Sequence, residues 1–577
     1  MRYFALATDY DGTLAHDGVV DAATTETLIQ LQASGRSLIL VTGREIDDLQ
    51  SVFDRLDLFA WVVAENGALL YEPSTRDEFK LAEPIDPRFA AALKRKGIEP
   101  LSTGRVIVAT REPHEATTLQ TIRDLGLELQ VIFNKGAVMV LPTGVNKGTG
   151  LVEALKRLEL SPHNVAGVGD AENDHGFLDM CELSAAVKNA LPAVKERATI
   201  TLKGARGDGV QELAAAMLKD DLRAWSKKNG RTLLMGETNR GALVEVPVFE
   251  KNLLLAGSSG GGKSTLAKAF LERLYEQSYQ FCVIDPEGDY ESFEAGVVLG
   301  DRTRAPLPEE ALQVLSDPEQ NLVLNLLGVP LDERPKYFNT LIAELLELRA
   351  RTGRPHWIVI DEAHHVLPED SHRSGLTLSK DLTNIVMITV EPGSVLHSAL
   401  DLVDMVFTVG QDPSGTMRAF AKAAKRTPPP LPRASFEKGE ALVWETSKKT
   451  ARRLEVAPSS FEHHRHKRKY ATGDVGEQYS FYFRGPNEEL NLPARNLIEF
   501  LRIARGIDPE TWSFHLRRRD YSNWFRGVIK DVELADKTVT VERNRRLSPD
   551  ESLTQIENLI GDTYTLPDQS KPSGIQT

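Results

Sequence analysis

Short apolar runs separated by longer mixed segments recur along most of the chain. Phe4–Thr8, Ser37–Gly43 and Val165–Asp170 each have the pattern of a buried strand that ends at a polar residue or a turn. Apolar runs between helix-like segments are typical of parallel strands covered by helices on both faces. From Leu490 to Leu534 the apolar residues recur at helical spacing instead. The pattern predicts an α/β protein that ends in a small, mainly helical module.

A second group of strand patterns follows residue 250. Each run is apolar and is separated from the next by a helix-like or turn-rich segment. Parallel strands arranged in this way place their functional side chains at the carboxyl edge of the sheet. The six runs are Lys251–Ala256, Gln280–Asp285, Asn321–Asn325, His356–Asp361, Ile385–Val390 and Met405–Val409.

The length of the chain indicates several domains, because 577 residues exceed what one core accommodates. A polar connector, Lys219–Arg231, contains the turn signal Asn229-Gly230 and predicts a boundary. Strand- and helix-like segments between about residues 72 and 143 predict an α/β cap inserted into the first sheet. We therefore expect a first domain, a linker, a second domain, a basic linker with a helical module, and a disordered tail, at 1–220, 221–235, 236–445, 446–548 and 549–577.

Composition and charge make some classes of protein less favoured but do not identify the function. The formal net charge of −14 argues against a wholly basic nucleic-acid binder, although a local basic patch remains compatible with it. No apolar run approaches the ~20 residues that cross a bilayer, and the N-terminus has an acidic residue where a signal peptide would continue its apolar core. The two cysteines, Cys181 and Cys282, lie in apolar surroundings and are expected to be core residues. We expect a cytoplasmic protein with no membrane partner.

Acidic residues follow the strands of the first domain. Asp9 and Asp11 stand two apart at the end of a strand, so both side chains point the same way. Two adjacent carboxylates repel, and such a pair usually holds a cation or divides nucleophilic from acid–base work. Thr42 ends the next strand, and Lys147 precedes a helix.

Asp170 ends a further strand and is followed by Asp174. In order, Asp9 with Asp11, Thr42, Lys147, and Asp170 with Asp174 resemble the four motifs of the haloacid dehalogenase superfamily, in its capped branch of sugar- and phosphoglycolate-type phosphatases. Ala64–Ala68 and Gly207–Val210 fit the same branch. The resemblance implies a Rossmann-like core with an inserted cap. It also implies an aspartyl-phosphate on Asp9, acid–base work by Asp11, and a grip on the phosphoryl group by Thr42 and Lys147. The Mg²⁺ residues implied are Asp9, Asp11, Asp170 and Asp174.

A glycine-rich loop opens the second domain. Its sequence has the form G-x-x-x-x-G-K-[ST], follows an apolar strand and precedes a helix, which is the context that phosphate binding needs. Lys263 is placed to reach the β- and γ-phosphates, and Ser264 to hold Mg²⁺. Asp361 and Glu362 follow a buried strand ~100 residues later, so Asp361 is expected at Mg²⁺ and Glu362 at the attacking water. The nucleotide-binding residues expected are Gly257, Ser258, Ser259, Gly260, Gly261, Gly262, Lys263, Ser264 and Thr265.

The wider pattern of this domain resembles ATPases of the HerA/FtsK type, the hexameric DNA pumps and their relatives. The supporting stretches are Gly241–Pro247, Asp285–Tyr290 and Asp361–His364. The resemblance implies ATP as cofactor and a homo-oligomer such as a hexamer. These relatives carry a glutamine after the fifth strand, where this chain has Thr389–Pro392. Either Thr389 or Glu391 senses the γ-phosphate in its place, or sensing is altered. Arg418 is a candidate arginine finger, although a helix arginine is more often a surface residue.

The last part of the chain gives weaker signals. Phe461–Tyr470 is a dense basic run with three histidines, which fits either a solvated linker or a contact with a phosphate backbone. The spacing of its histidines does not favour a metal site. The aromatic residues of the helical module are more often core than base-stacking platforms.

Three functions remain open from the sequence. The leading one is a two-activity protein, a Mg²⁺-dependent phosphatase for a phosphorylated small molecule fused to an ATPase. The second is a nucleic-acid translocase with an accessory phosphatase, which the basic run favours and the overall acidity opposes. The third is a phosphatase gated by a nucleotide-binding domain that is no motor.

Overall fold

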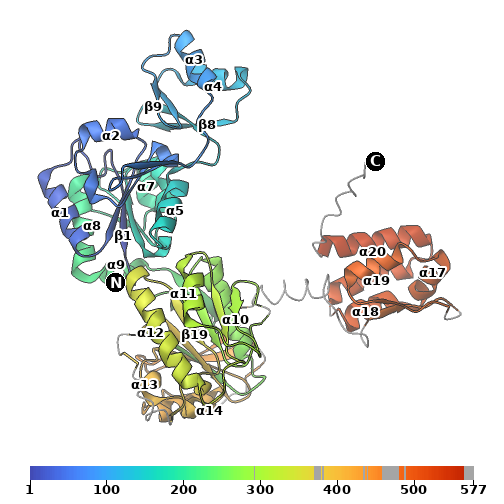
Figure 1. Cartoon of the computed structure of the whole chain (residues 1–577). Coiled ribbons are helices and arrows are strands. Elements are labelled where there is room, and N and C mark those ends of the chain that lie inside the picture. The colour runs from blue at the N-terminus through green and yellow to red at the C-terminus, as the bar shows by residue number, and fades with distance from the viewer. Residues whose placement is uncertain are drawn as a thin grey trace. The chain divides into compact units, whose positions relative to one another are not determined.

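A computed structural model of the chain describes residues 1–563 apart from 292, 370–377, 380, 381, 433–435, 438, 458–479, 487, 488 and 530. It divides into two compact units, Met1–Ala457 and Pro458–Thr577. The first unit contains two parallel-stranded sheets and a small antiparallel one, and the second is mainly helical (Figure 1). This is the predicted fold class, a mixed α/β chain with a helical C-terminal part.

The first sheet has eight described strands in the order β12-β11-β10-β1-β2-β3-β4-β5. Its centre, β1 (Ala5–Asp9), is wholly buried between β10 (Val165–Gly169) and β2 (Ser37–Val41), and all three are parallel. Helices lie on both faces, α1 and α8 on one side of β1 and α5 and α7 on the other (Figure 1), which explains the uninterrupted apolar runs. These helices span Ala22–Ala33, Gly207–Asp220, Lys147–Arg157 and Pro192–Arg197. The remaining strands are β3 (Trp61–Ala64), β4 (Leu69–Glu72), β5 (Asp77–Lys80), β11 (Leu183–Ala186) and β12 (Ile200–Thr201).

The cap is a four-stranded antiparallel sheet with two helices and its own core. Its strands run in the order β6-β7-β9-β8 and span Ser102–Thr103, Val108–Arg111, Ala137–Pro142 and Leu129–Asn134. Helices α3 (Pro87–Arg95) and α4 (Glu115–Asp124) cover it. One part of the segment expected in the cap belongs elsewhere, because β5 pairs with β4 in the core sheet.

The second large sheet carries all six strands expected after residue 250. They are β15 (Leu253–Gly257), β16 (Phe281–Asp285), β18 (Leu322–Asn325), β19 (Trp357–Ile360), β20 (Ile385–Thr389) and β21 (Met405–Val409), and with β17 (Val297–Leu299) they pair in parallel. Strand β20 lies between β15 and β19. The principal helices are α10 (Lys263–Glu276), α11 (Pro308–Ser316), α12 (Arg334–Thr352) and α14 (Pro413–Ala423).

Four antiparallel strands extend this sheet, and two of them, β13 and β23, pass the expected boundaries of the second domain. They are β13 (Thr232–Glu237), β14 (Leu243–Pro247), β22 (Glu440–Glu445) and β23 (Ala451–Val456). Strand β13 begins inside the expected linker, after the short helix α9 (Arg223–Asn229), and β23 lies past residue 445. One face of β14 is exposed, so its apolar residues alternate with polar ones and its strand signal is weak.

The second unit is a helical module around an aromatic core. Strands β24 (Phe481–Phe483) and β25 (Leu492–Ala494) precede α16 (Leu497–Ala504), α17 (Pro509–Arg518), α18 (Asp520–Gly527), α19 (Val532–Arg543) and α20 (Pro549–Thr563). The expectation of disorder from residue 549 is wrong for α20, because Ile556 and Ile560 are completely buried in that core. The basic run Phe461–Tyr470 lies outside the described residues.

Two smaller expectations can be compared with the structure. Cys181 and Cys282 are free and buried, as the sequence indicated. Among the described helices, none combines the length and the apolar character needed to cross a membrane.

Candidate active sites

The first site lies where β1 and β10 end and α5 begins. Lys147, the first residue of α5, donates from Nζ to Asp9 Oδ1 and to Asp174 Oδ1, each at 2.6 Å, and all three side chains are buried. Burial and the charge of Asp174 raise the pKa of Asp9 to about 7, although Lys147 acts in the opposite direction. Burial lowers the pKa of Lys147, but Asp174 and Asp9 outweigh it and raise the pKa overall, so Lys147 keeps its charge. The result is a buried ion pair at the edge of the sheet.

Three carboxylates of this site could hold a cation. Asp9, Asp170 and Asp174 each present one oxygen, and these oxygens lie within 4.8 Å of one another. Oxygen ligands suit a hard divalent ion such as Mg²⁺, so the donor set fits the expected metal. Asp174 is held in place because its Oδ2 accepts the N–H groups of Asp170 and Ala171, each at 2.9 Å.

Asp11 is turned toward a different partner. Both of its carboxylate oxygens accept from Arg44, from Nε and Nη2, at 2.7 Å each. Thr42 is completely buried beside this pair, and its Oγ1 accepts the N–H of Arg44 at 3.1 Å. Arg44 therefore orients the expected acid–base residue, a role that the motif spacing does not reveal.

A cavity of about 700 Å³ separates these residues from the cap. Lys135, in the turn between β8 and β9, donates to Asp170 Oδ2 at 2.9 Å and to the carbonyl of Asp11 at 2.8 Å. Gly12 makes this approach feasible, because a Cβ there would lie 2.5 Å from Asp170 Oδ2 and 2.7 Å from Lys135 Nζ, and its φ is +85°. The cap contributes Ser102, Thr110, Arg111, Asn134 and Lys135 to the lining.

Glu65 fastens the cap to the core. Its Oε1 accepts the N–H of Arg105 at 2.7 Å, and its Oε2 accepts those of Val106 and Ile107 at 2.9 and 3.1 Å. Glu65 is completely buried, and its φ of +51° is rare for a residue with a side chain. One carboxylate therefore holds the turn between β6 and β7 in place. From the sequence alone, Glu65 is identified only as part of the segment Ala64–Ala68.

The second site is the loop between β15 and α10. Gly260 and Gly262 have φ values of +70° and +99°, which the curled loop requires, and a Cβ on Gly257 would meet the carbonyl of Val409 at 2.4 Å. Lys263 is buried, and its Nζ donates to the carbonyl of Ser258 at 3.4 Å. Ser264 lies in the first turn of α10, where free amides and the helix dipole favour an anion.

The acidic pair after β19 lies next to this loop. Asp361 is buried, and burial raises its pKa to about 7 although it accepts the N–H of Glu362 at 2.9 Å. Glu362 has a φ of +36°, and its Oε1 lies 4.0 Å from Lys263 Nζ. His364 Nδ1 lies 3.4 Å from Glu362 Oε2 and 3.2 Å from Thr389 Oγ1. Thr389 is therefore linked to the acidic pair through His364.

Arg418 has a mostly exposed side chain. It is 59% exposed, and its Nη2 lies 4.0 Å from Asp412 Oδ2, at the limit of an ion pair. That exposure is compatible with an arginine finger and equally with a surface residue.

Two family models match parts of the chain. Residues 6–100 and 94–213 match one described as haloacid dehalogenase-like hydrolase, and residues 242–387 match one described as AAA ATPase domain. The phosphoglycolate phosphatase of Methanothermobacter thermautotrophicus is 30% identical over 217 residues, which are 36% of this chain and 96% of that protein.

Two further relatives are similar to a comparable share of the chain. Phosphoglycolate phosphatase 2 of Saccharolobus solfataricus is 29% identical over 227 residues, 37% of this chain and 91% of that protein. A crystal structure of a haloacid dehalogenase-like hydrolase from Bacteroides thetaiotaomicron aligns with a TM-score of 0.33 and 18% identity, over 37% of this chain and 99% of that one.

Proposed function

The chain belongs over residues 6–213 to the haloacid dehalogenase-like hydrolase family, and from this premise we propose that its first domain hydrolyses a small phosphomonoester through a phosphorylated Asp9. The observation that carries the proposal is the buried contact of Asp9 with Lys147 beneath a capped cavity of about 700 Å³. A carboxylate in such a position can attack phosphorus in line, while the lysine neutralises the charge of the phosphoryl oxygens.

The reaction has two balanced steps. A carboxylate oxygen of Asp9 bonds to phosphorus as the bond to the leaving oxygen breaks, and Asp11 gives its proton to that oxygen. Asp11 then takes a proton from water, whose oxygen attacks phosphorus, and inorganic phosphate leaves as Asp9 is regenerated. Thr42 and Lys147 hold the phosphoryl oxygens. Mg²⁺ bound among the site's aspartates would supply further positive charge against the phosphoryl group.

The cavity favours a substrate with a second negative group. Arg44, Lys135 and Lys147 line it but are ion-paired with aspartates of the site. Arg111 also lines it and has no ion pair among the described residues, so its guanidinium is placed to meet a second negative group. Relatives of this region are named phosphoglycolate phosphatases, and phosphoglycolate carries a carboxylate next to its phosphate. We therefore propose a phosphorylated small acid as the substrate.

The second domain is proposed to bind and hydrolyse ATP with Mg²⁺. The AAA-type match and the contact of Lys263 with Glu362 support this assignment. Glu362 would polarise the attacking water, Ser264 and Asp361 would hold the metal, and Thr389 would sense the γ-phosphate through His364. A HerA/FtsK-like, oligomeric form of this ATPase belongs to the same proposal, and stimulation of ATP hydrolysis by DNA would favour the translocase alternative.

Two variants of the full chain test both activities in one preparation. Asp9→Asn is expected to abolish phosphatase turnover and to leave ATP hydrolysis intact, and Lys263→Ala is expected to abolish ATP hydrolysis. A panel of phosphorylated acids, with neutral phosphomonoesters as the comparison, identifies the substrate class. Full phosphatase activity in Asp9→Asn would refute the aspartyl-phosphate route, and normal ATP hydrolysis in Lys263→Ala would refute the assignment of the loop.

A further inference from the structure

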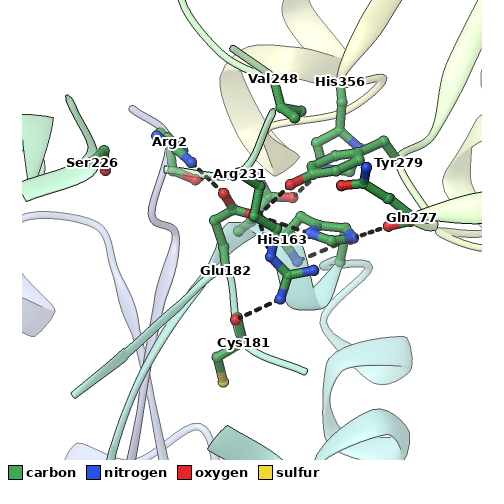
Figure 2. A network of polar contacts seen from close by, with 12 residues as sticks. Arg2, His163, Cys181, Glu182, Ser226, Arg231, Val248, Gln277, Tyr279 and His356 are labelled. Carbon is green, nitrogen blue, oxygen red and sulfur yellow. Dashed lines mark hydrogen bonds and ion pairs between the residues drawn. The ribbon is translucent and has the colours of Figure 1, made fainter. Parts of the chain in front are cut away.

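The two parallel sheets of the first unit meet through the amino ends of their strands. Arg2 precedes β1, His163 precedes β10 and Glu182 precedes β11, while Tyr279 and His356 precede β16 and β19. Polar contacts join these residues across the boundary between the sheets (Figure 2). Both candidate active sites lie at the opposite, carboxyl edges of these two sheets. We call the set of contacts at the amino ends the joint.

Glu182 is the centre of the joint. It is buried, its Oε2 accepts from His163 Nδ1 at 2.9 Å and from the Tyr279 hydroxyl at 2.7 Å, and its Oε1 pairs with Arg2. Burial pushes its pKa up, but His163 and Arg2 outweigh that effect and hold the pKa below its ordinary value. The His163 ring stacks on Tyr279 with 3.8 Å between ring centroids. The carboxylate of Glu182 thus has partners on both oxygens, and buried polar contacts of this kind are strong because the local dielectric constant is low.

Arg354 forms the second half of the joint. It is completely buried and donates to the carbonyl of Glu159 at 3.2 Å from Nε, and to Gln280 Oε1 at 2.8 Å. Next to it, His356 Nδ1 accepts the N–H of Gln280 at 2.9 Å, so Nε2 carries the proton and donates to Asn164 Oδ1 at 3.2 Å. Both residues thus bridge the ATPase sheet to the base of the phosphatase core.

Four elements connect the joint to catalytic residues. Helix α5 starts at Lys147 and is followed by Glu159, and β10 follows Asn164 and ends before Asp170. Helix α10 starts at Lys263 and ends before Gln277, whose carbonyl lies 2.7 Å from His163 Nε2. Strand β19 follows His356 and leads to Asp361. Every one of these elements therefore has a catalytic residue at one end and a joint residue at the other.

We propose that the joint couples the two active sites, so that nucleotide bound at the loop Gly257–Thr265 changes phosphatase turnover, with Arg354 and Glu182 as positioning residues. This proposal rests on both activities proposed above. A nucleotide that shifts α10 or β19 by a fraction of an ångström must also shift their ends at the joint, because packed interiors are not compliant. Coupling free energies between two sites typically change the affinity for a ligand by about 5- to 150-fold.

The test uses the full-length chain, the phosphorylated acid that is hydrolysed fastest in the panel above as phosphatase substrate, and AMP-PNP with Mg²⁺ as a nucleotide that is not turned over. Basal hydrolysis and AMP-PNP binding are measured first, and failure of either one refutes the proposed function rather than the coupling. Saturating AMP-PNP is then expected to change kcat/KM of the phosphatase at least about fivefold. In Lys263→Ala that effect should vanish, since an effect that survives would come from nucleotide in the phosphatase cavity and would refute the proposal.

Arg354→Lys tests the joint itself, and Arg351→Lys is its matched control. Arg351 lies three residues away and is exposed, so its variant should keep the full AMP-PNP effect. Arg354→Lys loses the forked contacts to Glu159 and Gln280 and should reduce the effect to less than twofold while AMP-PNP still binds. A full effect in folded Arg354→Lys would overturn the proposal. Glu182→Gln gives the same readout if Arg354→Lys does not fold.

Hydrogen exchange of the wild-type protein tests the coupling without any variant. AMP-PNP should slow amide exchange at residues 159–164 and 354–357, on both sides of the joint. Continuity through packed elements is not in itself coupling, so this measurement is made alongside the change in kcat/KM. No change in phosphatase kinetics, or a kinetic change with unaltered exchange at these amides, would overturn the proposal.

Discussion

Replacing Glu65 with glutamine should loosen the cap without touching the reacting groups. The carboxylate accepts three backbone N–H groups of residues 105–107 at 2.7–3.1 Å and is completely buried. In Glu65→Gln one oxygen becomes an NH₂ group, so one charge-assisted bond is lost and two donors face each other. Hydrogen bonds to charged groups contribute about 1.5–3 kcal/mol, so the closed cap should lose about 2–3 kcal/mol.

That loss converts to a fall in kcat/KM of about 30- to 150-fold, at about 1.4 kcal/mol per factor of ten. The assay is steady-state hydrolysis of a phosphorylated acid, with ATP hydrolysis and thermal melting measured on the same preparation. Glu78→Gln is the control, because Glu78 binds the half-exposed side chain of Arg105 at 2.8 Å. A surface pair of this kind is worth about 0–1 kcal/mol, so less than a fivefold loss is expected. Unchanged kcat/KM in folded Glu65→Gln would refute the reasoning.

Three further predictions concern other parts of the chain. Gly12→Ala should reduce phosphatase kcat/KM at least about tenfold with ATP hydrolysis unchanged, since its Cβ would clash with Asp170 and Lys135. The melting temperature of the wild type should exceed that of Glu182→Gln above pH 4.5, and this gap should close as pH falls, because a depressed pKa stabilises only the ionised form. A gap independent of pH would contradict this. Ending the chain at residue 548 should abolish cooperative tryptophan-monitored unfolding of the helical module, because burial of Ile556 and Ile560 is worth about 2–5 kcal/mol each.

The site residues that could be predicted from the sequence all belong to local sequence motifs. Asp9 ends an apolar strand and Lys147 starts a helix, so the neighbouring residues in the sequence are enough to identify them. Glu65, Arg44 and Lys135 contribute through contacts with residues far away in sequence, such as the 124 residues between Lys135 and Asp11. No local pattern encodes a partner at that separation.

The boundaries of the domains and their strands were predictable only where local sequence determines them. Six buried parallel strands were predictable from continuous apolar runs, whereas β13 and β23 pair across more than two hundred residues and each mixes buried with more exposed positions. Helix α20 was missed because a segment rich in polar and small residues resembles disorder until Ile556 and Ile560 find an aromatic core. In each case contacts with residues distant in the sequence stabilise the element, and composition does not reveal such contacts.

The amino-end joint also determines what can pass between the two reactions. Each site opens at the far end of strands of about five residues, so roughly 30 Å of packed sheet separates the two chemistries at 3.3 Å per residue. The proposed coupling between the two domains would therefore be carried by the positions of helices and strands, because the two sites lie at opposite ends of this packed layer. Either domain could in principle be replaced by another parallel α/β domain whose strand starts offer matching polar groups.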